Sequence, residues 1–228
     1  MTITTTKLTR AAGICAVLAG AIFIGVQIGH PDMNPTSITT TEVVIRNTLK
    51  VLMCALAVAG ITGMYVSQVR RNGTVGLIGY ALLAAGYLLI MSSTYATAYV
   101  LPEVAGADPS FARDFIAASK GDTPVGDIGT LGTMISLQGF AYLAGGLLFG
   151  IALYRARVLA RWAAVLLAVG GVVSVALSMM PDAFYRLLAF PNGIAMIGLG
   201  YSLWREKHIV IPEAIPSVGT PDLESAGV

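Results

Sequence analysis

Long apolar stretches constrain this chain of 228 residues more than any motif in it. A helix needs roughly 20 apolar residues to cross a bilayer core about 30 Å thick. The first stretch, residues 11–29, meets this length with Gln27 as its only polar side chain. Further stretches follow at residues 43–69, 75–100, 131–153, 162–180 and 187–204. The sequence therefore predicts an all-α polytopic membrane bundle of six transmembrane helices.

The composition agrees with this fold and excludes several classes of protein. Only 11% of the residues are charged and 56% are apolar, whereas a soluble domain has about 25% charged residues. The net charge of +2 gives no basic surface of the kind that binds nucleic acid. The apolar content also excludes a disordered chain and argues against a soluble enzyme.

The basic residues predict the orientation of the bundle. Nine of the 14 lysines and arginines fall beside the apolar stretches on one side: Lys7, Arg10, Arg70, Arg71, Arg155, Arg157, Arg161, Arg205 and Lys207. The positive-inside rule makes that side cytoplasmic. We therefore expect a multi-pass protein of the cell membrane with both termini inside. Residues 1–207 form the transmembrane domain, and residues 208–228, polar with three prolines, form a disordered cytoplasmic tail.

The long outer loop, residues 101–130, contains a predicted helix. Asp108 followed by proline is typical of a helix N-terminus. Phe111, Phe115 and Ile116 then recur on one face of that helix. The pattern predicts a short amphipathic helix, either a lid over an outward cavity or a loop anchored by its phenylalanines.

Ionisable residues inside the second stretch are the most informative local feature. Glu42, Arg46 and Lys50 are spaced at i, i+4 and i+8 on one helix face, with Asn47 beside them. Charged side chains within a membrane are costly and face a bundle interior or water. Two interpretations are balanced here: a structural ion network, or one wall of a ligand-binding cavity.

Further polar and aromatic residues enter the outer halves of the other stretches. The third and fourth stretches contribute Met91, Tyr95, Tyr99, Gln138 and Tyr142. The beginning of the sixth contributes Asp182, Tyr185, Arg186 and Asn192. Buried amides and phenols need partners. We therefore predict one outward-opening cavity that is apolar and aromatic below and charged at its mouth.

The residues that are missing limit the chemistry of such a cavity. The only histidines are His30 and His208, and Cys15 and Cys54 lie at different depths in their spans. No metal site and no cofactor site is predicted from these residues. Carboxylic acids remain as candidate catalytic groups: Glu42, Glu103 and Asp182. An acid held protonated in an apolar pocket can donate a proton, and aromatic faces can stabilise a cation.

Two resemblances bear on function. The closing segment, Pro191–Asn192–Gly193 followed by Gly198–Leu–Gly200–Tyr201–Ser–Leu–Trp204, together with the Gly- and Ala-rich spans, resembles small multi-span actinobacterial membrane proteins of unassigned role. In general design the chain also resembles the integral-membrane terpene cyclases, bundles of about this size that use acidic residues without metal.

These observations lead to three hypotheses. The first, which we favour because several ionisable groups lie beside aromatic residues, is a membrane enzyme that protonates and cyclises a lipid-soluble isoprenoid by metal-independent acid/base catalysis. The second is a non-catalytic lipid-binding or accessory membrane subunit. The third, disfavoured because the cytoplasmic halves of the first and fifth stretches are almost without polar residues, is a small transporter. In each case the partner is a membrane lipid or another lipid-soluble small molecule.

Overall fold

The computed structural model describes residues 3–178 and 189–206, and every regular element in these ranges is a helix. Six long elements form the body of the molecule: α1 (Thr5–Gly25), α2 (Thr41–Ser67), α3 (Val69–Tyr99), α6 (Thr130–Ala156), α7 (Arg161–Ser178) and α9 (Ala189–Arg205). Three short ones lie between them: the 3₁₀ turn η1 (Ser37–Thr39), α4 (Leu101–Ala107) and α5 (Pro109–Lys120).

Helices α1, α2, α3 and α6 are each long and apolar enough to cross a membrane. This finding confirms the all-helical class and indicates a membrane protein. The expected number of six spans needs α7 and α9 as well, which are shorter at 18 and 17 residues. The expected tail and three of the candidate residues, Asp182, Tyr185 and Arg186, lie outside the described residues.

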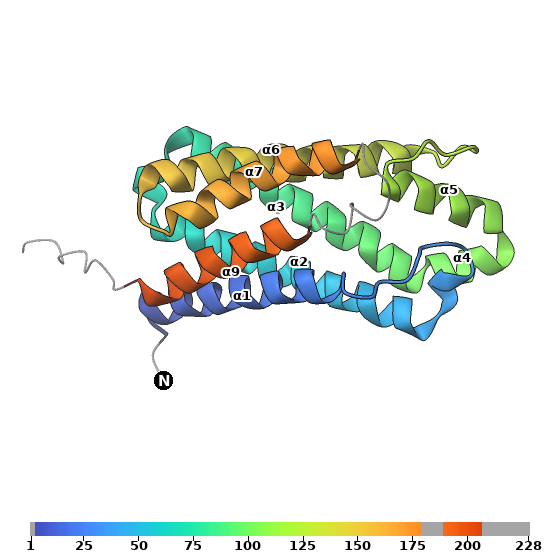
Figure 1. Ribbon diagram of the computed structural model, residues 1–228, viewed down its shortest axis with the longest axis horizontal. Helices are drawn as coiled ribbons and strands as arrows, with labels where there is room; N and C mark the ends of the chain where they lie inside the picture. Colours follow the sequence, from blue (N-terminus) through green and yellow to red (C-terminus); the bar gives the residue numbers. More distant parts are fainter. Residues whose placement is uncertain (1–2, 179–188, 207–228) are drawn as a thin grey trace, which may run out of the picture.

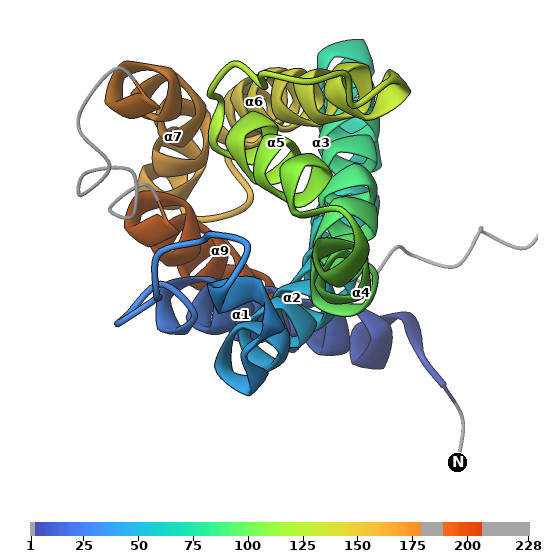
Figure 2. The ribbon, with the colours of Figure 1, turned by 90° about the vertical axis from the view of Figure 1, so that its right-hand side faces the viewer.

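The long helices form an elongated bundle (Figure 1) in which each packs against two neighbours around a closed ring. Helix α1 contacts α9 and α2, and the ring continues through α3, α6 and α7 back to α9. Figure 2 shows this ring from the end that α4 and α5 cover. Residues from all six helices therefore share one interior.

Two helix pairs approach most closely, and glycine makes each approach possible. On α6, a Cβ added at Gly145 would lie 2.3 Å from the backbone nitrogen of Leu83 on α3. A Cβ at Gly13 on α1 would lie 2.7 Å from the carbonyl oxygen of Gly200 on α9. Small residues permit such contact between helix backbones in membranes. The α3–α6 and α1–α9 pairs thus pack with their backbones in close contact.

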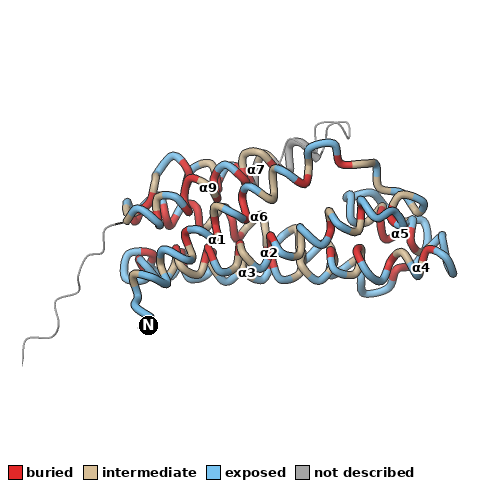
Figure 3. Tube along the Cα trace, turned by 90° about the horizontal axis from the view of Figure 1, so that it is seen from below, coloured by how far each residue is buried: buried red, intermediate tan, exposed pale blue. Residues whose placement is uncertain are grey.

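Buried apolar residues form two separate clusters, and Figure 3 shows where buried residues lie along the chain. The larger one joins the six long helices and includes Ile61, Leu83, Phe149 and Leu199. The smaller one lies under η1, α4 and α5: Ile38, Leu101, Ala105, Ala112, Phe115 and Ile116. This second core fixes α4 and α5 across one end of the ring.

Helix α5 begins and ends as local sequence signals require. The carboxylate of Asp108 accepts hydrogen bonds from the backbone N–H groups of Ser110 and Phe111. Gly121 ends the helix in the left-handed conformation, with φ of 90°. Asp114 is buried and accepts the N–H groups of Val125 and Gly126, which holds the following loop against the helix. The side of the membrane on which α5 lies stays a prediction.

Candidate functional site

The charged residues of α2 meet the end of α1 in a tight hairpin. Helix α1 ends at Gly25, and the chain turns through residues 26–29, where Gly29 has φ of 63°. The last carbonyl groups of a helix have no partner within it. Because α2 runs back alongside α1, its first turns face these carbonyl oxygens.

Arg46 uses its whole guanidinium group in this hairpin. Nη1 donates to the carbonyl oxygens of Val26 and Ile28, each at 3.0 Å. Nη2 donates to the carbonyl of Gly29 at 3.2 Å and lies 2.8 Å from Oε1 of Glu42. Nε donates to the same carboxylate oxygen at 2.9 Å. Four hydrogen bonds and the ion pair with Glu42 thus engage all three guanidinium nitrogens, and Arg46 fastens α1 to α2.

Lys50 lies one turn deeper and contacts His30, which follows the same turn. Its Nζ is 3.0 Å from Nε2 of His30, whose Nδ1 is 2.8 Å from the carbonyl oxygen of Pro31. A carbonyl can only accept a hydrogen bond, so Nδ1 of His30 donates to Pro31, and Nε2 is the ring atom that faces Lys50. His30 is 7% exposed. The contact therefore brings a charged donor to the edge of the interior.

Asn47 lies on the interior face of α2, between Val43 and Lys50 along that face. Only 3% of the residue is exposed. Its Nδ2 has no hydrogen-bond partner among the residues that the structure describes. A buried amide donor without a partner is costly. Within the described ranges Asn47 is thus an unsatisfied donor, three positions before Lys50 on α2.

An open groove runs along the outer side of the same hairpin. Its volume is about 460 Å³, and its lining comes from α1 and α2: Ile22, Gly25, Val26, Glu42, Ile45, Arg46 and Leu49. Ile45 is 54% exposed and Leu49 is 39% exposed. We call this feature the α1–α2 groove. Its walls are apolar, and the Glu42–Arg46 ion pair contributes its polar part.

Candidate residues of the third and fourth spans meet across the interior. The rings of Tyr87 and Tyr142 lie edge to face with centroids 5.3 Å apart, and Tyr87 is 2% exposed. Met91 packs at the margin of the main core. The amide oxygen of Gln138 accepts the hydroxyl of Ser93 at 2.8 Å. These contacts join α3 to α6.

The remaining candidates are distributed elsewhere. The rings of Tyr95 and Tyr99 lie 4.9 Å apart at an interplanar angle of 51°, and both residues are about half exposed. The hydroxyl of Tyr99 is 2.8 Å from that of Thr48. Glu103 is exposed on α4. Asn192 is buried, and its side chain lies against Gly170 on α7, where a Cβ would meet Oδ1 at 2.2 Å. The structure thus brings Glu42, Arg46, Asn47 and Lys50 together, and it places the others in smaller groups.

Sequence reasoning missed two parts of this site. His30 contacts Lys50, although the two residues are 20 positions apart. A hairpin register that places the end of α1 opposite the second turn of α2 would have indicated this contact. The backbone carbonyl groups that accept from Arg46 cannot be predicted from residue type, because every residue has a backbone carbonyl.

The described residues include no group of three or more His, Cys, Asp and Glu side chains that could hold a metal ion. Comparisons with protein-family models, with curated proteins and with solved structures find no match for this chain. The function is therefore argued from the geometry of the hairpin.

Proposed function

We propose that this protein is a membrane-embedded binding protein for a lipid-soluble amphiphile, which it holds in the α1–α2 groove. One observation carries this proposal: an open apolar groove of about 460 Å³ ends at a fixed ion pair, Glu42–Arg46. Ligand sites of this size combine apolar walls with a few oriented polar groups. An apolar chain along Ile45 and Leu49 would place its polar end beside that pair.

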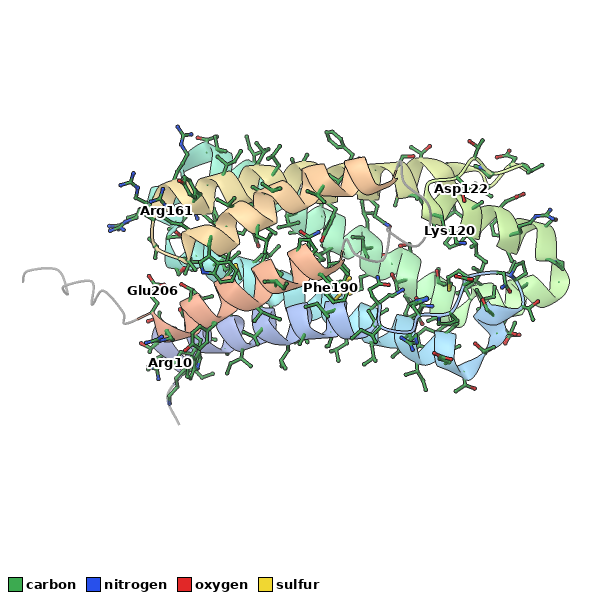
Figure 4. The ribbon with its side chains drawn as sticks, in the orientation of Figure 1. Arg10, Lys120, Asp122, Arg161, Phe190 and Glu206 are labelled. Atoms are coloured by element: carbon green, nitrogen blue, oxygen red, sulfur yellow. The ribbon has the colours of Figure 1, made fainter. Side chains whose placement is uncertain are left out.

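The proposal includes six spans, with α7 and α9 as the fifth and sixth, in the cell membrane. The closed ring supports this number, because α7 packs against α6 and α9 packs against both α7 and α1. A membrane domain made only of the four longer helices would exclude two helices that complete the ring. Arg10 and Arg161 lie at the end of the bundle opposite Lys120 and Asp122 (Figure 4). Basic residues at that end support a cytoplasmic location for both termini.

Acid catalysis on an isoprenoid stays a second proposal, and the described carboxylates favour binding over it. A proton donor of this kind needs an apolar surrounding that keeps its acid neutral. The side chain of Glu42 is 56% exposed and paired with Arg46, and Glu103 is exposed. If the protein were such an enzyme, Glu42→Gln, Glu103→Gln or Asp182→Asn would abolish turnover in a folded protein. Unchanged turnover in all three would exclude the mechanism.

Native mass spectrometry of protein purified in gentle detergent tests the binding proposal. Ile45→Trp fills the groove, whereas Leu88→Trp makes the same kind of change at a position of α3 with similar exposure, 47% against 54%. We expect a co-purified amphiphile on the wild type and on Leu88→Trp, and a several-fold smaller bound fraction on Ile45→Trp. Equal bound fractions in the two variants would contradict the proposal.

A further inference from the structure

A second groove lies between the beginning of α7 and the end of α9, at the end of the bundle where Figure 4 labels Arg161 and Glu206. Its volume is about 390 Å³, and its lining includes Trp162 of α7 together with Gly198, Tyr201, Ser202, Arg205 and Glu206 of α9. Trp162 is 58% exposed and Tyr201 is 50% exposed, so the groove opens to the surroundings of the bundle. We call it the α7–α9 groove.

Arg205 and Ser202 bring hydrogen-bond donors to this groove. Nη1 of Arg205 donates to the hydroxyl of Tyr201 at 3.4 Å, and the guanidinium lies 5.5 Å from the centroid of that ring. No ion pair joins Arg205 to a carboxylate among the described residues. Oγ of Ser202 accepts the N–H of Ala160 at 3.0 Å, which leaves its own O–H as a donor. A guanidinium and a hydroxyl together suit the oxygens of a phosphate group.

The charges at this end of the bundle favour an anion. Eight described lysines and arginines lie near the helix ends here: Lys7, Arg10, Arg70, Arg71, Arg155, Arg157, Arg161 and Arg205. Glu206, which also lines the groove, is the only Asp or Glu of the described residues at this end. With Glu206 counted, cations remain in large excess, and such an excess attracts anionic headgroups.

Exposed apolar side chains continue from the groove toward the middle of the bundle. Val165 and Val169 follow Trp162 by three and seven positions, so they share its face of α7. Ile194 precedes Gly198 by four positions on the neighbouring α9. These three residues are 42% to 45% exposed. An acyl chain would pack along them while its headgroup lies beside Arg205.

We propose that the α7–α9 groove binds an anionic phospholipid, whose phosphate accepts hydrogen bonds from Arg205 and Ser202. Trp162 and Tyr201 lie beside the headgroup, the level at which these two residue types are enriched in membrane proteins. The proposal rests on the proposed membrane spans α7 and α9. It does not rest on the α1–α2 groove, which lies at the other end of α1 and α2, so failure of either site leaves the other intact.

Quenching of Trp162 fluorescence by brominated phospholipids in vesicles tests the proposal. The chain has two tryptophans, and Trp204→Phe leaves Trp162 as the only fluorescent one. Brominated phosphatidylglycerol reaches Trp162 with about a fivefold preference over phosphatidylcholine of the same chain length, the effect of one arginine on an anionic lipid. Equal quenching by the two brominated lipids overturns the proposal.

Two arginine variants in this background separate a site from general surface charge. Arg205→Gln and Arg70→Gln each remove one exposed cation at the same end of the bundle, but α3, which carries Arg70, is no ring neighbour of α7 or α9. Arg205→Gln lowers the preference to about one, and Arg70→Gln leaves it near fivefold. An equal reduction in the two variants overturns the proposal, because the preference then comes from overall charge.

Inorganic phosphate distinguishes a lipid from a water-soluble phosphate. Equal quenching by brominated phosphatidylglycerol in phosphate and in chloride buffers of the same ionic strength supports the lipid site. Selective loss of quenching in phosphate assigns the groove to a soluble phosphate and overturns the proposal.

Discussion

Arg46 of α2 donates a hydrogen bond to the carbonyl oxygen of Val26, the residue that caps the C-terminal end of α1, at a distance of 3.0 Å. The negative end of a helix is stabilised by a cation at this position. Together with the carbonyls of Ile28 and Gly29, this contact makes the turn between the first two helices a single unit. These contacts hold α2 in position beside α1, and the α1–α2 groove depends on that position.

Replacing Arg46 by methionine should destabilise the protein by about 2–4 kcal/mol, because partly buried acceptors lose charged donors. Arg46→Lys should lose less, since an ammonium keeps the charge but reaches fewer of the acceptors. Chemical unfolding in detergent measures both. Arg70→Met, at an exposed position, is the control and should change the free energy of unfolding by less than about 0.5 kcal/mol. A loss for Arg46→Met no larger than that of the control would show that the residue does not fasten the hairpin.

Two glycines of α6 should respond in opposite ways to substitution by alanine. A Cβ at Gly145 would lie 2.3 Å from the backbone nitrogen of Leu83, whereas a Cβ at Gly139 would meet no heavy atom within 4 Å. Gly145→Ala should therefore cost at least about 1–3 kcal/mol through overpacking. Gly139→Ala should stabilise the helix by up to about 1 kcal/mol. Melting temperatures of the two variants test this contrast, and a stabilising Gly145→Ala would contradict the close approach of α3 and α6.

The start of α5 should depend on pH. The Ser110 hydroxyl, followed by the Phe111 and Ser110 N–H groups, donates to Asp108 and lowers the pKa of this carboxyl below its ordinary value. A lowered folded pKa means that the carboxylate stabilises the helix above the unfolded value, about 3.9 for Asp, and that this contribution is lost as pH falls through the folded value. Carbon chemical shifts of residues 109–120 should therefore lose helical character in acid. Asn caps helices as well as Asp, so the same acid response in Asp108→Asn would refute this cause.

Cysteine labelling should place the two ends of the bundle on opposite sides of the membrane. In a background with Cys15 and Cys54 replaced by alanine, a membrane-impermeant maleimide should label Val125→Cys in intact cells, since this residue is 91% exposed beside α5. Arg70→Cys, between α2 and α3, should react only after lysis. Labelling of both variants in intact cells would contradict the proposed orientation.

Apolar length predicted the helices well, because crossing a membrane requires that length whatever the packing. The expected span at residues 131–153 corresponds to Thr130–Ala156. The third helix begins earlier than residue 75 because a helical turn from Val69 joins it across a kink at Gly73, whose φ is 59°. Apolar length carries no information about such a turn.

The site was predictable only where its contacts are local in the chain. The spacing of Glu42 and Arg46 predicts their ion pair, which the structure contains. Tyr95 and Tyr99, which were expected to line a cavity, are about half exposed, whereas Tyr87 on the same helix is buried. Helical spacing predicts which residues share a face of α3. It does not predict the residue beyond which the neighbouring helices no longer cover that face. Contacts of Arg46 and Lys50 with α1 and its following turn depend on hairpin register, which residue spacing does not contain.

Photo-crosslinking tests the central claim most directly. A photoreactive residue at Leu49 lines the α1–α2 groove, and the same residue at Leu88 has comparable exposure on α3 outside it. Irradiation in native membranes should join one species of lipid-soluble amphiphile to position 49, while position 88 captures bulk phospholipids in proportion to their abundance. The same mixture of bulk phospholipids at both positions would mean that the groove selects no ligand, and the proposed function would be wrong.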